Sequence, residues 1–263
     1  MPAELRVGIC AWADPALIET GTFYPRKSMS AEARLRYYAE FFDTVEVNSS
    51  YYAIPDVRNA VRWCERTPPG FLFSIKAYSL MTGHHPRPDS LPAELQRLLP
   101  PSPRRTHRGE IHRAAFPPEA LDECFRLYRA AIDPLVAAAK LGYVLFQLAP
   151  WVRYGEAACA YLASLPARLP GWTIAVELRN ETWIPGHTEP VLRLLADHGL
   201  AFVAVDAPWQ PLREVSLFAT DAEFFVKASG VPSRDESQAR GMKALLGAME
   251  ASPRLRQTIV RTL

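Results

Sequence analysis

The chain has 263 residues, of which 49% are hydrophobic and 22% are charged, and its formal net charge is +2. These values are typical of a globular protein with one large core and exclude an intrinsically disordered chain. So small a net charge gives no sign of a nucleic-acid or anionic-membrane partner held by overall charge.

The sequence also carries signals about location. No apolar run approaches the roughly 18 residues that a membrane-spanning helix needs. The first residues lack a basic segment followed by an apolar core, so we expect no export. Four cysteines lie far apart without a CxxC spacing, which favours reduced thiols over disulfides or a zinc site: Cys10, Cys64, Cys124 and Cys159. We therefore expect a cytoplasmic protein without a membrane partner.

Short apolar runs alternate with helical patterns along most of the chain. Strands are predicted at residues 5–10, 44–48, 71–76, 143–148, 173–178, 201–206 and 223–228. Helices are predicted at residues 30–42, 57–67, 117–140, 156–168, 188–198 and 237–249, and Ser30 and Asp56 suit the N-caps of the first two. This alternation favours an α/β fold with parallel strands. Seven strands suit a TIM-barrel-like (β/α) barrel, either closed or incomplete at the C-terminus, better than an open sheet.

The stretch from about residue 79 to residue 116 interrupts the pattern. Prolines at positions 86, 88, 92, 100, 101 and 103 exclude a long regular element, although residues 93–99 suit one helix. A loop of this length in a compact domain is usually a functional lid or a disordered segment. We predict a single barrel domain over residues 1–263 that carries this proline- and arginine-rich loop.

The stretch TVEVNSSYY, at residues 44–52, carries the clearest candidate site. Glu46 and Asn48 alternate with valines, so the two polar side chains share one face of the predicted strand. Further polar residues stand at or just past the ends of the other predicted strands: Lys76, Gln147, Glu177, Arg179 and Asp206. The ends of parallel barrel strands converge on one face, so we expect these groups to surround a single pocket.

The mixture of charges in this predicted ring suits acid–base chemistry. Glu46 and Glu177 would act as acid and base, because carboxylates that share a site have pKa values pushed apart. Lys76 and Arg179 would hold a negative charge on a substrate or a developing oxyanion. The remaining members would orient the substrate: Asn48, Gln147 and Asp206. The alternative is that these groups only pair with neighbours to satisfy a polar barrel end.

Loop residues near the predicted pocket have two interpretations each. His84 follows the third predicted strand, where it could act as an acid or a base, or lie solvated in the loop. Tyr51 and Trp183 follow strand ends and could stack on a sugar or base ring, although single aromatics there are more often packing residues. Cys10 ends the first predicted strand with no histidine nearby in sequence, so we interpret it as a buried structural cysteine.

A metal centre is a less favoured alternative. Glu46, Glu177 and Asp206 could supply oxygen ligands for Mg²⁺ or Mn²⁺. No histidine stands on a predicted strand end, where a metal site of mixed ligands would need one. The sequence therefore indicates no metal site and no particular cofactor.

The 44–52 stretch resembles the E-(I/V)-N-S-(T/S)-(F/Y)-Y signature of the YecE-like family, domain of unknown function 72. The likeness continues in order through GICAW at 8–12, FYP at 23–25, KA at 76–77, TGHHP at 82–86, KLG at 140–142, FQ at 146–147, AVELRNETW at 175–183 and VDAP at 205–208. The resemblance implies a TIM-barrel-like fold and favours a site role for His84. It implies no settled activity.

Residues beyond about position 210 depart from that family pattern. An R-F-H-G-R-N-like motif is expected on the next strand, but residues 224–230 read FFVKASG, without the histidine and the asparagine. An altered reading frame, a truncation or real divergence would each explain the difference. Closure of the barrel and catalytic competence both depend on which one applies.

The leading hypothesis is an enzyme, such as a hydrolase, a lyase or an isomerase, that acts on a small anionic or sugar-like molecule. A second is a non-catalytic protein that binds a small ligand in the same pocket. A third is nucleic-acid binding through the basic run between Arg104 and Arg113, which is less favoured because no aromatic residues are interleaved with it. The expected partner is thus a small molecule, and the sequence indicates no oligomeric state.

Overall fold

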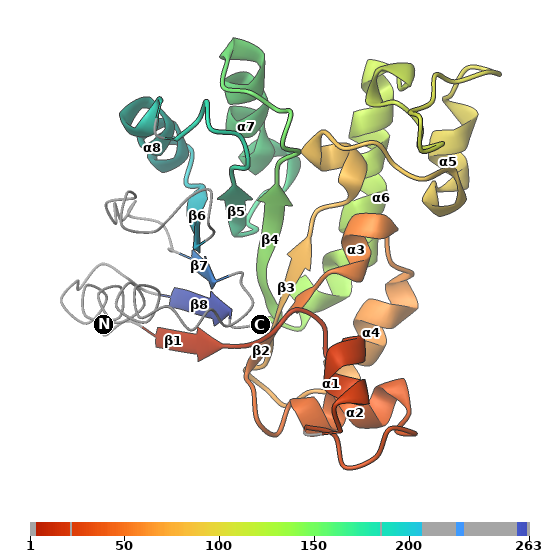
Figure 1. Ribbon diagram of the computed structural model, residues 1–263, viewed down its shortest axis with the longest axis vertical. Coiled ribbons are helices and arrows are strands. Elements are labelled where there is room, and N and C mark those ends of the chain that lie inside the picture. The colour runs from red at the N-terminus through yellow and green to blue at the C-terminus, as the bar shows by residue number, and fades with distance from the viewer. Residues whose placement is uncertain (1–3, 22, 185, 207–224, 229–256, 262–263) are drawn as a thin grey trace. The chain divides into compact units, whose positions relative to one another are not determined.

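A computed structural model describes residues 4–21, 23–184, 186–206, 225–228 and 257–261 (Figure 1). The chain divides into two compact parts, which are described separately. One part is Cys10–Ala149, and the other consists of the described residues of Met1–Ile9 and Pro150–Leu263. The prediction of a single domain concerns how the two parts join, and it stays a prediction.

Three parallel strands form the sheet of the part Cys10–Ala149: β2 (Thr44–Val47), β3 (Leu72–Lys76) and β4 (Leu141–Gln147). Strand β3 pairs with both of the others (Figure 1), and the register places Glu46 opposite Ser74. The helices are α1 (Pro15–Glu19), α2 (Ala31–Tyr38), α3 (Ser49–Tyr52), α4 (Val57–Glu65), α5 (Ala93–Arg97) and α6 (Pro118–Ala137). Both predicted caps are confirmed, because the side chains of Ser30 and Asp56 accept backbone N–H bonds at the starts of α2 and α4.

The core of this part lies on the face of β3 that carries Phe73 and Ile75, both fully buried. Phe73 stacks on Trp63 of α4 with ring centroids 5.8 Å apart, and α4 in turn packs against α6. Because side chains alternate along a strand, Ser74 and Lys76 project from the opposite face. The packing of Phe73 and Ile75 therefore anchors β3 in the core, and the face with Ser74 and Lys76 can contribute to a site.

The loop between β3 and α6 consists of short elements and confirms the prediction that no long regular element forms there. It holds the 3₁₀ turns η1 (Ser79–Thr82), η2 (Pro88–Ser90) and η3 (Arg113–Ala115) besides α5, and an antiparallel bridge between Arg105 and Ile111. Its apolar side chains are buried: Leu80, Met81, Leu91, Leu95 and Ile111. The segment is thus packed by its own hydrophobic residues, as a compact loop is.

The other part has five parallel strands: β1 (Glu4–Val7), β5 (Ile174–Glu177), β6 (Ala201–Asp206), β7 (Phe225–Ala228) and β8 (Gln257–Arg261). They pair in the order β1-β8-β7-β6-β5. The helices are α7 (Glu156–Arg168) and α8 (Thr188–Asp197). Strand β8 is an eighth strand that the sequence analysis missed, and the helix predicted at residues 237–249 lies outside the described residues. Among the helices that the structure describes, none is both long enough and apolar enough to cross a membrane.

Candidate functional site

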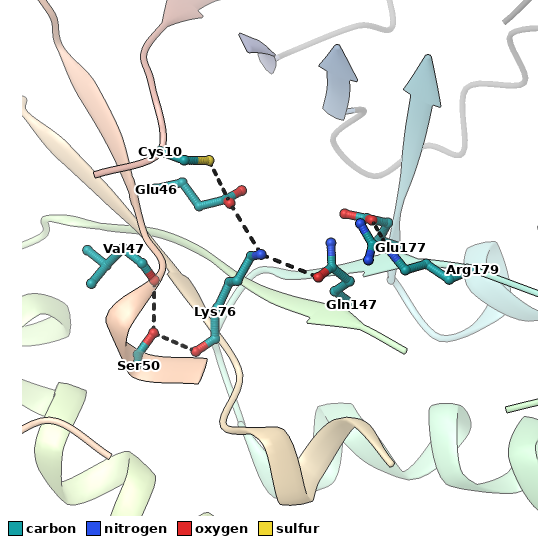
Figure 2. A network of polar contacts seen from close by, with 8 residues as sticks. All are labelled: Cys10, Glu46, Val47, Ser50, Lys76, Gln147, Glu177 and Arg179. Carbon is teal, nitrogen blue, oxygen red and sulfur yellow. Dashed lines mark hydrogen bonds and ion pairs between the residues drawn. The ribbon is translucent and has the colours of Figure 1, made fainter. Parts of the chain in front are cut away.

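Glu46 lies at the centre of a polar cluster in the part Cys10–Ala149 (Figure 2). The thiol of Cys10 donates to its Oε1 at 2.9 Å, and the Nζ of Lys76 lies 3.9 Å from the same oxygen. Lys76 Nζ also donates to Oε1 of Gln147 at 3.3 Å. The structure thus brings together three residues from the predicted ring, one each from the C-terminal ends of β2, β3 and β4.

The cluster is largely withdrawn from solvent. The side chains of Glu46 and Lys76 are 8% and 14% exposed. Charges at such depth interact more strongly than in water, and their desolvation is costly unless hydrogen bonds and an opposite charge compensate. Cys10 and Gln147, both buried, supply part of that compensation.

Two hydroxyl groups hold the backbone of Lys76. Ser50 Oγ, on α3, lies 2.8 Å from the Lys76 carbonyl oxygen and 2.9 Å from that of Val47, so its single proton serves two acceptors (Figure 2). The hydroxyl of Tyr128, on α6, donates to the same Lys76 oxygen at 2.9 Å. Ser50 and Tyr128 are fully buried, so these bonds fix the end of β3 from two helices.

The chain after β1 reaches the cluster by an unusual turn. Strand β1 ends at Val7, earlier than predicted, and Cys10 forms an isolated parallel bridge with Glu46. Ala11 then adopts φ 75°, and its N–H donates to the carbonyl oxygen of Glu46 at 3.0 Å. Positive φ is uncommon for alanine, and such backbone strain tends to occur at functional sites. From its sequence, Cys10 was interpreted as a buried structural cysteine. It is buried, but the hydrogen bond from its thiol to Glu46 was not predicted.

Three other residues from the predicted ring and loop belong to the same part. Asn48, at the N-cap of α3, has a buried Oδ1 without a hydrogen-bond partner in the described structure. The rings of Tyr51 and His84 meet edge to face with centroids 5.0 Å apart, and Thr82 Oγ1 lies 2.8 Å from Nδ1 of His84. Gly83 (φ 84°) ends η1 and turns the chain towards His84, a conformation that favours glycine.

Glu177 and Arg179 form a pair in the other part. Glu177 ends β5 and is fully buried, and Nε of Arg179 donates to its Oε1 at 2.8 Å (Figure 2). Trp183 is also fully buried and donates from Nε1 to the Val152 carbonyl at 2.8 Å, so it holds the loop after β4. Asp206 is the last residue of β6, and its side chain lies outside the described residues. The ligand contacts predicted for these residues stay predictions.

A buried lysine in the part Cys10–Ala149, Lys140, has surroundings different from those of Lys76. Lys140 precedes β4, and its Nζ donates to the Cys64 carbonyl at 2.8 Å, to the Thr67 carbonyl at 2.6 Å and to Thr67 Oγ1 at 2.8 Å. Burial lowers the pKa of this amine. Within the described ranges, no group of three or more His, Cys, Asp or Glu side chains is placed to hold a metal ion.

Residues 6–259 match a protein family described as "Protein of unknown function DUF72". The chain belongs to the DUF72 family. A curated relative, the UPF0759 protein YunF of Bacillus subtilis strain 168, is 30% identical over 203 residues. The match covers 77% of this chain but 60% of that relative, so it spans less than two thirds of the relative's length.

Two solved DUF72 structures resemble this chain. One, from Enterococcus faecalis V583, has a TM-score of 0.69 at 18% identity and covers 98% of this chain and 90% of its own. The other, from Thermotoga maritima MSB8, has a TM-score of 0.66 at 23% identity, with coverages of 98% and 91%. At these identities the likeness concerns the fold alone. The family and the TIM-barrel-like α/β fold expected from the sequence are both confirmed.

Proposed function

We propose that this DUF72 protein is an enzyme that binds a small polar molecule, anionic or sugar-like, and transforms it by acid–base chemistry beside Glu46. One observation carries the proposal: the Glu46 carboxylate and the Gln147 amide, each at its own strand end, lie 3.9 and 3.3 Å from Lys76 Nζ at a third strand end. Buried groups of opposite charge at strand ends of a parallel barrel are typical of catalytic sites.

Each member of the cluster has a role in this proposal. Glu46 accepts a proton from the substrate and returns it, while the thiol of Cys10 holds one of its oxygens in place. Lys76 supplies the positive charge that stabilises an oxyanion as it develops. Gln147 orients the substrate, and the buried Oδ1 of Asn48 offers an acceptor to a substrate hydroxyl.

The catalytic role of Glu177 and Arg179 is a separate prediction, because the two residues lie in the other part of the chain. This prediction rests on the sequence pattern, and the complete burial of the Glu177 carboxylate supports it. Buried carboxylates are costly to keep and are common at catalytic centres. Loss of activity in Glu177→Gln tests this role independently of Glu46.

The test is a screen of sugars, sugar phosphates and small carboxylic acids for thermal stabilisation, followed by turnover assays on the compounds that bind. Glu46→Gln should reduce turnover about 10²–10⁴-fold, the usual contribution of a general acid or base. Glu40→Gln is a matched control, since Glu40 is exposed in the same part of the chain. The proposal fails if Glu46→Gln leaves every turnover rate and ligand affinity unchanged. Saturable binding that is never followed by turnover would instead favour the non-catalytic alternative.

We further propose that this activity resides in the cytoplasm. The four cysteines are free, with Cys10 and Cys124 buried and the other two half-buried, which suits a reducing compartment. Localisation of the tagged full-length protein by fractionation tests this proposal.

A further inference from the structure

Two lysines of the part Cys10–Ala149 are largely withdrawn from solvent, and their amines contact different kinds of group. Lys140 donates all three of its N–H groups to acceptors at 2.6–2.8 Å, a geometry that ties a structural amine in place. The neighbours of Lys76 Nζ include the Glu46 carboxylate at 3.9 Å and the Gln147 amide oxygen at 3.3 Å. The Lys76 amine therefore lies beside a group that can take up and return a proton, whereas the Lys140 amine is bound by carbonyl and hydroxyl oxygens.

Two hydroxyl groups hold the backbone of Lys76 in place. The hydroxyls of Ser50 and Tyr128 bind its carbonyl oxygen at 2.8 and 2.9 Å, from α3 and from α6. The side chain therefore starts from a fixed point and reaches a restricted volume next to Glu46. A nucleophile benefits from such placement, because less orientational freedom is lost when it reacts.

We propose that Lys76 is a nucleophile that forms an imine with a small aldehyde or ketone substrate. This inference rests on the acid–base function proposed above and narrows its substrate class to carbonyl compounds. Lysines partly withdrawn from solvent beside a proton-transferring group are the usual Schiff-base nucleophiles.

The covalent step balances with the groups present. Glu46 takes a proton from the Lys76 ammonium, and the nitrogen lone pair then attacks the carbonyl carbon while the C=O π electrons move to oxygen. Proton transfer from nitrogen to that oxygen gives a neutral carbinolamine. Glu46 returns its proton to the carbinolamine hydroxyl, which leaves as water as the C=N bond forms. A ketone and an ammonium thus become a protonated imine and water, with no oxidant or reductant, and the positive charge remains on nitrogen.

The experiment traps this imine in the wild-type full chain. The protein is incubated near neutral pH with glycolaldehyde or with pyruvate, sodium borohydride is added, and secondary amines are mapped by peptide mass spectrometry. The chain has five lysines, so assignment is direct: Lys27, Lys76, Lys140, Lys227 and Lys243. Lys27 is exposed and serves as the ordinary lysine, while Lys140 controls for burial alone.

We expect Lys76 to be trapped about tenfold or more faster than Lys27 with at least one of the two probes, since a neighbouring general base accelerates the step. Lys140 should be trapped more slowly than Lys27. Trapping of Lys76 no faster than that of Lys27 with both probes overturns the imine. Because this comparison uses only wild-type protein, it does not depend on the folding of any variant.

A variant separates this inference from the proposed function. Glu46→Gln should slow trapping at Lys76 about tenfold and leave Lys27 unchanged; equal trapping in the variant would contradict the role given to Glu46. If Lys76 is not trapped but turnover or ligand binding still depends on Glu46, the imine is wrong and the proposed function stands. If neither trapping nor any dependence on Glu46 is found, both are wrong.

Discussion

The thiol of Cys10 lies 2.9 Å from carboxylate oxygen Oε1 of Glu46, and both side chains are buried. The same oxygen is the one that faces Lys76 Nζ at 3.9 Å. The hydrogen bond from the Cys10 thiol holds Glu46 Oε1 in place, and it therefore also fixes the position of this oxygen relative to the Lys76 amine. The segment after β1 therefore helps to set the geometry at the ends of β2 and β3.

Removal of the Cys10 donor should destabilise the protein. Cys10→Ala leaves a buried carboxylate oxygen with one hydrogen bond fewer, and we expect the free energy of unfolding to fall by about 1–3 kcal/mol. Cys10→Ser keeps a hydroxyl donor at the same place and should lose less. Urea unfolding of the three proteins measures the difference.

The control for this pair of variants is Cys124, which is buried in α6 and whose pKa is raised by burial. Cys124→Ser buries a hydroxyl on the inner side of α6, so it should cost about 1–3 kcal/mol, more than Cys10→Ser. If serine is tolerated equally at both positions, the Cys10 thiol is not acting as a donor to Glu46.

The meeting of Glu46, Lys76 and Gln147 could be predicted from sequence, whereas the contribution of Cys10 could not. Alternation along parallel strands places every second side chain on one face, and strand ends in a barrel converge, so position alone relates the three residues. Cys10 reaches Glu46 only through an isolated bridge and the positive φ of Ala11. That path depends on local backbone geometry that no residue type signals.

Elements with strong local patterns were predicted with their bounds nearly intact, as α7 and β6 show. Helix α3 was missed because Ser49–Tyr52 has no strong helix former, and Tyr is typical of strands. It is stabilised by tertiary contacts of Ser50, which sequence patterns do not encode. Strand β8 was not predicted, although its Thr258-Ile259-Val260 run is β-branched. Residues 224–230 depart from the expected family motif, and this departure favoured an incomplete barrel without a further strand.

Neutralising the two buried glutamates should affect stability differently. We expect Glu46→Gln to leave the thermal midpoint unchanged or to raise it, because a carboxylate kept for function is held at the expense of stability. Glu177→Gln should lower the free energy of unfolding by about 1–2 kcal/mol, since it weakens a charge-assisted bond to Arg179 at 2.8 Å. Calorimetry of both variants beside Glu40→Gln decides between these outcomes. A fall with Glu46→Gln as large as that with Glu177→Gln would mean that the Glu46 cluster is scaffold.

The loop between β3 and α6 should open in mild acid. The rings of His85 and His112 stack with centroids 4.5 Å apart, and each Nδ1 accepts a backbone N–H, from Arg113 at 3.1 Å and from Ala114 at 3.2 Å. A protonated ring carries a proton on both nitrogens and can no longer accept. Protonation of His85 therefore breaks its bond to the Arg113 amide and places a positive charge against the stacked His112 ring.

The sign of this effect follows from the pKa of His85. Burial lowers it from the usual 6.5, as does the neighbouring His112, and the other charged groups that act on it are Glu110, which raises it, and Arg104 and Arg113, which lower it. The unfolded loop thus binds the proton more tightly, so the stability due to a neutral His85 is complete above about pH 6.5 and is lost as the pH falls towards the folded pKa. Hydrogen exchange at the Arg113 amide, corrected for its intrinsic rate, should speed up over that range. His85→Gln should flatten the dependence, whereas His107→Gln, at an exposed histidine of the same loop, should leave it intact.

Ser50 should be a positioning residue for Lys76, and its neighbour Ser49 provides the matched control. Ser50→Ala removes the donor shared by the Val47 and Lys76 carbonyls, so we expect a loss of about 1 kcal/mol in the free energy of unfolding. Ser49 is exposed, and Ser49→Ala should change stability by less than about 0.5 kcal/mol. If Ser50 has only a structural role, Ser50→Ala should cause this loss of stability and no other effect. If Ser50 also positions the amine, Ser50→Ala should slow borohydride trapping at Lys76 relative to Lys27 in protein that remains folded, and an unchanged ratio would limit Ser50 to joining the ends of β2 and β3.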